Sequence, residues 1–175
     1  MTEQATDRVR QLREALERNP GAMTMQLARD LGVPEVEVVR ALPDGRAVEM
    51  DAGRWEDILR SFEALGTVHV IVSNGATTIE AGGQFGGFST WGEFFNVQTK
   101  TLDMHLRWPQ LAAAFAVEKP SHMSDEVSTL SVQFFDRAGQ AAFKVFLNFG
   151  GKPTAERRRQ FDDLRARFAL GQTDS

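Results

Sequence analysis

The stretch TLDMHLRWPQLAAAFAVEKP, residues 101–120, decides the fold because its first half alternates apolar and polar side chains. Leu102, Met104 and Leu106 take every second position, which is the period of a strand with one buried face. Valines alternate in the same way over residues 68–72. This part of the chain is therefore predicted to form an antiparallel sheet. Its further strands are expected at residues 77–81, 94–98, 112–118, 130–135 and 142–149, with a hairpin turn at residues 136–139.

Apolar side chains recur at helical intervals both before and after the predicted strands in the sequence. Residues 5–42 repeat apolar side chains at helical intervals, with a break at Asn19-Pro20-Gly21. Thr24 is expected to cap the second helix, which Gly32 ends, and Pro34 is expected to open the third. Two more amphipathic helices are expected, over residues 55–65 and after Pro153.

These elements predict an α+β fold in a single domain, residues 1–175. An N-terminal helical hairpin takes residues 5–45, and a sheet with flanking helices and a C-terminal helix takes residues 55–170. A chain of 175 residues with 42% hydrophobic residues is about the size of one domain and can bury a real core.

The segment LARDLGVPEVEVVRAL, residues 27–42, has the pattern of a helix-turn-helix that reads DNA. In such a motif the second helix presents its first residues to bases and phosphates. Here those residues include Glu35 and Glu37, which phosphates would repel, and the whole chain carries a net charge of −4. We therefore interpret the segment as a structural hairpin and expect no nucleic-acid partner.

Composition excludes several kinds of site. The chain has no cysteine, so it forms no disulfide and no thiolate metal site. Its three histidines, His69, His105 and His122, lack the spacing of a hydrolytic zinc site. The N-terminus is charged and has no long apolar run, which argues against a secretion signal or a membrane span. We expect a cytoplasmic protein.

A glycine-rich run, GATTIEAGGQFGGF, covers residues 75–88. It lacks the lysine of a P-loop and does not lead from a strand into a helix, so it is not expected to bind phosphate. We interpret it as a flexible loop, although a strand is also predicted at residues 77–81.

His105 and Arg107 are the best candidates for ligand binding. If Leu102, Met104 and Leu106 face the core, these two side chains project from the opposite face, about 7 Å apart. An imidazole suits iron and a guanidinium suits carboxylates, so the pair would fit heme and its propionates. The alternative is that both are ordinary solvated residues of a half-exposed sheet.

Aromatic side chains near this strand offer walls for a flat ligand. The candidates are Phe85, Phe88, Trp91, Phe94 and Phe95. Phe94 and Phe95 lie in a predicted strand and are expected in the core, whereas Trp91 and Phe88 are candidates for ligand contact or dimer packing. The chain has no tyrosine, so no phenol can act as an axial ligand.

Five blocks, LGTVHVIVSNGATTIEAGG, GEFFNV, LDMHLRW, AFAVEKP and SVQFFDRAGQAAFKVFL, occur in the order typical of one protein family. The chain resembles the ChuX/HutX-like heme-utilisation carriers and each repeat of the larger HemS/HmuS-like hemin-handling proteins. The resemblance implies a saddle-like antiparallel sheet, a homodimer equivalent to one two-repeat protein, and reversible binding of heme for transfer inside the cell.

The resemblance also points to particular residues. His105 matches a family histidine and is the expected iron ligand, whereas the position of a second family histidine is Ser73 here. A further family histidine is absent from the stretch that reads GEFFNV here, residues 92–97, while Trp91 stands just before it. A single-ligand site is therefore expected, with water or an aromatic wall opposite His105, while Lys119 or Lys144 could contact a propionate.

The expected function is that of an intracellular heme carrier, which takes heme from donor proteins and passes it to acceptors. The missing second histidine leaves open a homodimer of the same fold that has lost heme and serves a structural or regulatory role. Heme degradation is a weaker third reading, because the resemblance extends to two-repeat relatives for which it is claimed.

Overall fold

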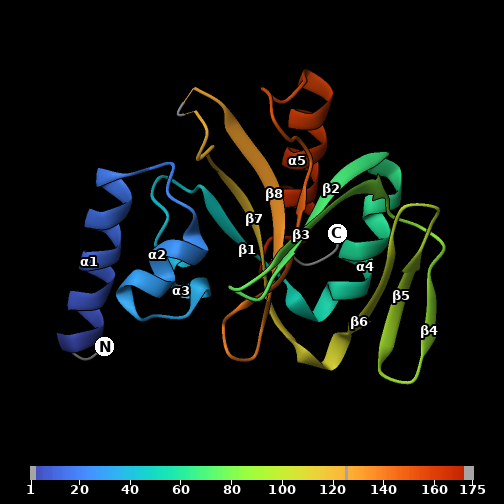
Figure 1. Cartoon of the computed structure of the whole chain (residues 1–175), viewed down its shortest axis with the longest axis horizontal. Helices are drawn as coiled ribbons and strands as arrows, with labels where there is room; N and C mark the ends of the chain where they lie inside the picture. The colour runs from blue at the N-terminus through green and yellow to red at the C-terminus, as the bar shows by residue number, and fades with distance from the viewer. Residues whose placement is uncertain (1–2, 125, 172–175) are drawn as a thin grey trace.

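The fold is built on a six-stranded antiparallel sheet with a three-stranded sheet beside it (Figure 1). The computed structural model describes residues 3–124 and 126–171. The larger sheet contains β1 (Ala47–Met50), β2 (Thr67–Ser73), β3 (Thr78–Gln84), β7 (Leu111–Pro120), β8 (Ser128–Asp136) and β9 (Ala141–Phe146). They are ordered β1-β7-β8-β9-β2-β3. The smaller sheet, ordered β4-β5-β6, contains β4 (Ser89–Trp91), β5 (Phe94–Gln98) and β6 (Asp103–Arg107).

The helices lie on both sides of the larger sheet (Figure 1). They are α1 (Glu3–Arg18), α2 (Thr24–Leu31), α3 (Glu35–Arg40), α4 (Trp55–Ser61) and α5 (Ala155–Phe168). Short 3-10 turns cover residues 52–54, 62–65 and 108–110. The expected α+β fold is confirmed, with strands close to all the predicted ranges. Among the helices of these described residues, none is long and apolar enough to cross a membrane.

One face of the larger sheet carries the main apolar core. Phe134 and Val145 project from it against Phe62, which follows α4, and against Phe161 of α5. The smaller sheet closes the same core with its inner face, where Phe95 and the other apolar side chains of β5 and β6 pack. The alternation in residues 101–108 thus produces the expected geometry, with an apolar inner face and a polar outer face.

The helical hairpin α1–α3 covers part of the opposite face, over β7 and β8. Leu12, Leu16 and Val39 pack there against Phe115 and Phe135. The hairpin docks on the β8–β9 turn, where the Val36 amide donates to the carbonyl of Gly139. Gly139 has a positive φ of 77°, and a Cβ there would lie 2.8 Å from Pro34 and Val36. The predicted turn at residues 136–139 is therefore confirmed and also serves as the docking point of the hairpin.

The interpretation of residues 75–88 as a flexible loop was wrong over much of its length, since β3 occupies residues 78–84. Its glycines allow close packing. A Cβ on Gly83 would lie 2.3 Å from the hydroxyl of Thr101, so the turn before β6 can approach β3 only at a glycine. Two strands, β1 and β4, were not predicted, because they are only four and three residues long and show no apolar alternation.

Thr24 does not cap α2, contrary to the prediction. It is the first residue of that helix, and its hydroxyl donates a hydrogen bond to the carboxylate of Glu35 at 2.6 Å. The residue before the helix, Met23, supplies no side-chain cap. The threonine instead joins α2 to α3, because a buried hydroxyl needs a partner and Glu35 is the buried acceptor beside it.

Candidate functional site

The predicted ligand residues divide between two surfaces of the molecule. His105, Arg107 and Trp91 share the outer face of the smaller sheet. Ser73 lies on the larger sheet, where it lines a cavity beside the helical hairpin. Phe88 lies immediately before β4 and packs against the core, with its ring stacked on that of Phe95 at 5.4 Å.

We call the first surface the histidine face, defined by Trp91, Phe94, Asn96, His105 and Arg107. The strand register places Trp91, Phe94 and Arg107 in one row across the sheet and Asn96 beside His105 in the next. The expectation that Phe94 lies in the core was therefore wrong, because strand alternation turns Phe95 inward and Phe94 outward. Trp91 is 77% exposed and stacks loosely on Phe94 at 6.4 Å. This face presents aromatic surface, an imidazole and a guanidinium to solvent from one side of a three-stranded sheet.

A chain of hydrogen bonds orients the imidazole of His105. Its Nδ1 lies 2.7 Å from the side-chain oxygen of Asn96, and the Asn96 amide in turn donates to the hydroxyl of Ser89 at 3.0 Å. An amide oxygen only accepts, so Nδ1 carries the proton in the neutral ring and Nε2 keeps its lone pair. Iron-binding histidines are oriented by such a partner on the other nitrogen. Nε2 lies 3.5 Å from the carboxylate of Asp103.

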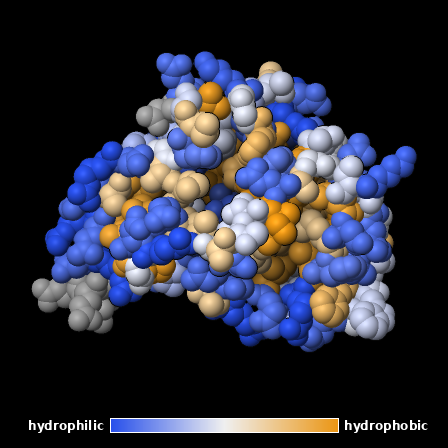
Figure 2. All heavy atoms as spheres, viewed as in Figure 1, coloured by the Kyte–Doolittle hydropathy of each residue, from blue (hydrophilic) through white to orange (hydrophobic). Residues whose placement is uncertain are grey.

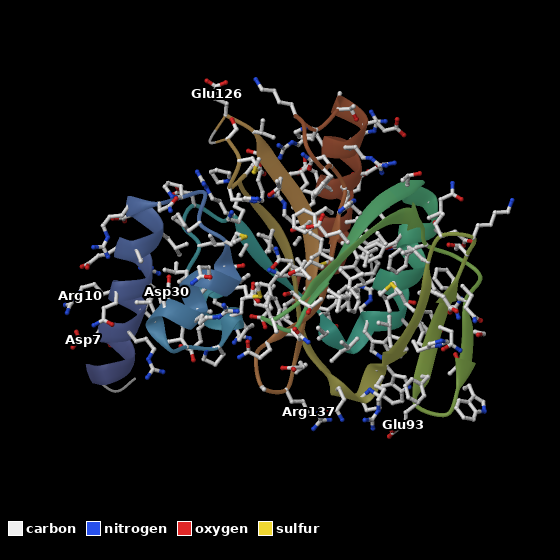
Figure 3. The ribbon with its side chains drawn as sticks, viewed as in Figure 1. Asp7, Arg10, Asp30, Glu93, Glu126 and Arg137 are labelled. Atoms are coloured by element: carbon white, nitrogen blue, oxygen red, sulfur yellow. The ribbon has the colours of Figure 1, made fainter. Side chains whose placement is uncertain are left out.

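Arg107 forms an exposed ion pair with Glu93 at 3.0 Å. Glu93 lies at the turn between β4 and β5, at the end of the molecule opposite the helical hairpin (Figure 3). Both side chains are more than half exposed, so water screens the pair and an incoming carboxylate can compete for the guanidinium.

The second surface, which we call the hairpin cavity, has a volume of about 610 Å³. It lies between the start of α2 and the connection from β7 to β8. Its third side is the part of the sheet face that the helical hairpin leaves uncovered, which carries Ile71 and Phe146. Figure 2 shows apolar surface around the hollow between the helical hairpin and the sheet. Pockets of this size and apolar character are typical of sites for small molecules and cofactors. Its apolar lining includes Met23, Met25, Ile71, Phe146 and Phe149.

A buried polar network lies in this cavity. The ammonium of Lys144 on β9 donates to the carboxylate of Glu35 at 2.5 Å and to the hydroxyl of Thr24 at 3.2 Å. Glu35 is 1% exposed. The network therefore joins α2 and α3 to the sheet and places the first residue of α3 inside the protein, where it cannot face a nucleic acid.

Other polar side chains line the same cavity, among them Lys119, His122 and Gln133. The ammonium of Lys119 donates to the backbone carbonyls of Gly21 and Pro120. His122 lies at the exposed edge, in the connection after β7. Gln133 lies on the floor, and its side-chain oxygen has no hydrogen-bond partner among the described residues. The cavity therefore offers apolar walls and polar groups, but its one lining histidine is at the rim.

Sequence reasoning did not single out Glu35 or Gln133 as site residues. The sequence indicated Glu35 only as a carboxylate that phosphates would repel. Its partner Lys144, 109 residues further along the chain, explains its burial. Gln133 had a signal, since it stands between Val132 and Phe134 in a strand with apolar residues on both faces.

No group of three or more metal-ligating side chains occurs within residues 3–124 and 126–171. The available side chains instead fit heme iron, because the porphyrin supplies most of the ligands of that metal. A single oriented imidazole can complete such a coordination sphere. Cationic groups are present on both surfaces, as Arg107 and as the two lysines of the cavity, of which Lys144 is already paired with Glu35.

Comparison with known proteins gives a consistent set of relatives. The model of the family described as Haem utilisation ChuX/HutX matches residues 48–164. The protein named intracellular heme transport protein HutX, from Vibrio cholerae, is 26% identical over 160 residues, which cover 90% of this chain and 79% of HutX.

Solved structures share the fold. The crystal structure of ChuX superposes with a TM-score of 0.78 at 21% identity, covering 89% of this chain and 96% of ChuX. The structure described as the heme degrading enzyme ChuS, from Escherichia coli O157:H7, superposes with a TM-score of 0.77 at 24% identity. It covers 97% of this chain but 48% of ChuS, so this chain spans about half the length of that protein.

Proposed function

The chain belongs to the haem utilisation ChuX/HutX family, as its sequence blocks predicted, and we propose that it binds heme reversibly and transfers it within the cytoplasm. The function is supported by the relative HutX, which is named an intracellular heme transport protein. In such a carrier heme is the cargo. Donor and acceptor proteins would then supply and receive it.

The position of the site is a further part of the proposal. The histidine face has an oriented iron ligand on an exposed sheet surface, whereas the hairpin cavity has apolar walls but its one lining histidine is at the rim. Two family histidine positions, Ser73 and His105, belong one to each surface. We infer that two copies of the chain form a homodimer in which His105 of one copy faces the cavity of the other.

The single observation that carries this arrangement is the separation of Ser73 and His105 on different sheets of one chain. The length of the two-repeat relative ChuS supports it, because two copies of this chain together span about one ChuS chain. A two-fold dimer of this kind contains two equivalent sites, each using one surface from each copy.

Each residue of the two surfaces then has a role. The Nε2 atom of His105 binds iron, and Asn96 holds the ring. Arg107 exchanges Glu93 for a propionate, which a guanidinium binds well, and Trp91 covers the porphyrin edge. Phe88 acts through packing beneath this face, while Ser73 lies where the family's second histidine would be. A site with one protein ligand suits release as well as binding.

A hemin titration tests the proposal. The wild-type protein should give a saturable shift of the Soret band, and His105→Ala should lose that shift. His122→Ala is the matched control, since it removes a histidine from the cavity rim, and it should retain the shift. No shift in the wild type at stoichiometric hemin would contradict the carrier function and favour the structural or regulatory dimer. A shift retained in His105→Ala would overturn the ligand assignment.

Transfer without degradation is also part of the proposal. The fold relative ChuS is described as a heme degrading enzyme, so this fold is compatible with heme degradation as well as with heme transfer. With reductant, oxygen and catalase present, heme bound to this protein should keep its ring and move intact to apomyoglobin. Accumulation of a ring-opened product would contradict the carrier reading.

A further inference from the structure

The floor of the hairpin cavity contains a buried acceptor without a partner. Gln133 is 3% exposed, and its side-chain nitrogen donates to the hydroxyl of Ser131 at 3.0 Å. Its Oε1 atom has no partner in the described part of the chain. Leaving a buried acceptor unpaired is unfavourable, so a ligand that donates a hydrogen bond here would recover that energy.

Lys144 stands directly across the strand pair from Gln133. Side chains in such a cross-strand pair have Cβ atoms about 4.5–5.5 Å apart, within reach of one small group. The ammonium of Lys144 has three N–H bonds, and two of them are directed to Glu35 and Thr24. The third can donate to a ligand oxygen next to Gln133.

The charge of this floor argues against a carboxylate ligand. Glu35 already compensates Lys144, and an ionised carboxylate would bring a second acceptor against Oε1 of Gln133. Other charged or titratable groups line the cavity at Lys119, Glu80 and His122, and Glu80 pairs with His69 at 3.2 Å. Lys119 lies opposite Thr129, which is four residues from Gln133 along β8. At the rise of a strand, this places Lys119 about 13 Å from Gln133 along the sheet.

We propose that Gln133 and Lys144 bind one carboxyl group of the porphyrin in its protonated, uncharged form. The acid O–H donates to Oε1 of Gln133, and Lys144 donates to the carbonyl oxygen. No bond is made or broken except that one proton is taken up from solvent on binding. This inference rests on the proposed heme site and adds that affinity depends on pH through the ligand.

Protoporphyrin is the probe, because it has the same carboxyl groups as heme but no iron, so the state of His105 does not enter. Its fluorescence anisotropy is titrated between about pH 7 and pH 9, a window between the ordinary ranges of histidine and lysine side chains. The wild-type affinity should fall with rising pH, by up to about tenfold per unit for one linked proton. The dimethyl ester of protoporphyrin should show no such slope.

Gln133→Met removes the acceptor at similar size and should abolish the slope. The matched control Thr129→Val, on the same strand and lining the same cavity, should retain it. A slope below twofold over the whole window in the wild type, or an equal slope for the ester or for Gln133→Met, overturns the inference while leaving hemin binding intact. Failure of both hemin and protoporphyrin to bind at any pH overturns the proposed function as well.

Discussion

The hairpin cavity and the histidine face each hold an ion pair, and their surroundings differ sharply. The pair of Glu35 and Lys144 is buried, with side chains 2% and 16% exposed, whereas Glu93 and Arg107 are 59% and 53% exposed. Removing one partner of a buried pair leaves a charge without water, but removing one partner of an exposed pair leaves it solvated. The polar groups of the cavity thus stabilise the fold, while the pair on the histidine face is exposed, so a ligand can replace one partner.

The largest expected effect is on stability. Glu35→Ala leaves the ammonium of Lys144 nearly buried and without its carboxylate, which should lower the free energy of unfolding by about 3–5 kcal/mol. Urea denaturation followed by circular dichroism measures it. Glu93→Ala is the exposed counterpart and should change stability by less than about 1 kcal/mol. Equal effects of the two substitutions would show that the difference in burial does not matter.

The second effect is on affinity and belongs to the histidine face. Asn96→Leu removes the acceptor that orients His105, and loss of such a partner typically weakens metal binding by about 10–100-fold. Hemin titration measures the change. Gln98→Leu, on the same face of β5, is the control and should bind like the wild type. Unchanged affinity in Asn96→Leu would mean that the hydrogen bond does not prepare the ligand.

The third predicted effect is on stability and compares two neighbouring glycines of β3, of which Gly83 is closely packed and Gly82 is not. Gly83→Ala forces a methyl group against Thr101 and should cost about 1–3 kcal/mol by overpacking. Gly82→Ala meets no atom within 4 Å and should leave stability within about 0.5 kcal/mol. Thermal unfolding of the two variants compares them. A costly Gly82→Ala with a harmless Gly83→Ala would contradict the close approach of the two sheets.

The smallest effect concerns Arg158, which joins α5 to Glu118 of β7 at 2.6 Å. This hydrogen bond raises the pKa of Arg158 above its ordinary value, although burial opposes it. A raised arginine pKa stabilises the fold at every pH below the ordinary arginine pKa, and this contribution is lost only as pH rises through the folded pKa. The contribution of this arginine should therefore be constant between about pH 5 and pH 9.

Glu118→Gln tests this contact, because it removes the charge but keeps the shape. The side chains of Arg158 and Glu118 are 36% and 26% exposed, so the cost should stay below about 1 kcal/mol, with no dependence on pH in that range. A loss of several kcal/mol in chemical denaturation would mean that the contact is far less screened than its exposure indicates.

The spacing of apolar residues predicted most helices and strands of this fold. Buried positions recur every second residue in a strand and every three or four residues in a helix. Leu102, Leu106 and Phe161 take positions that their spacing alone identifies as inward-facing. The short strands β1 and β4 escaped prediction because their pairing partners, and not their own side chains, make them strands. That the chain is a single domain stays a prediction.

The candidate site was less accessible to sequence reasoning. Alternation indicated that His105 and Arg107 share an exposed face, and the structure shows them there. It could not show that Ser73 lies on a different sheet, or that Glu35 meets Lys144 across more than a hundred residues. Both features depend on how segments far apart in the sequence pack together. The local spacing of apolar residues does not contain that information.

Mixed dimers test the central claim most directly. Ile71→Trp should fill the cavity of its own copy, and His105→Ala removes the ligand from the other surface. Neither variant alone should bind hemin, while the control Val72→Trp, on the opposite side of the same strand, should bind it.

In an equal mixture of the Ile71→Trp and His105→Ala copies, half of the dimers pair one of each, and every such dimer contains one intact composite site. The account predicts recovery of about a quarter of the wild-type hemin sites on mixing. No recovery in a mixture that native mass spectrometry shows to contain mixed dimers would contradict a site shared between two copies.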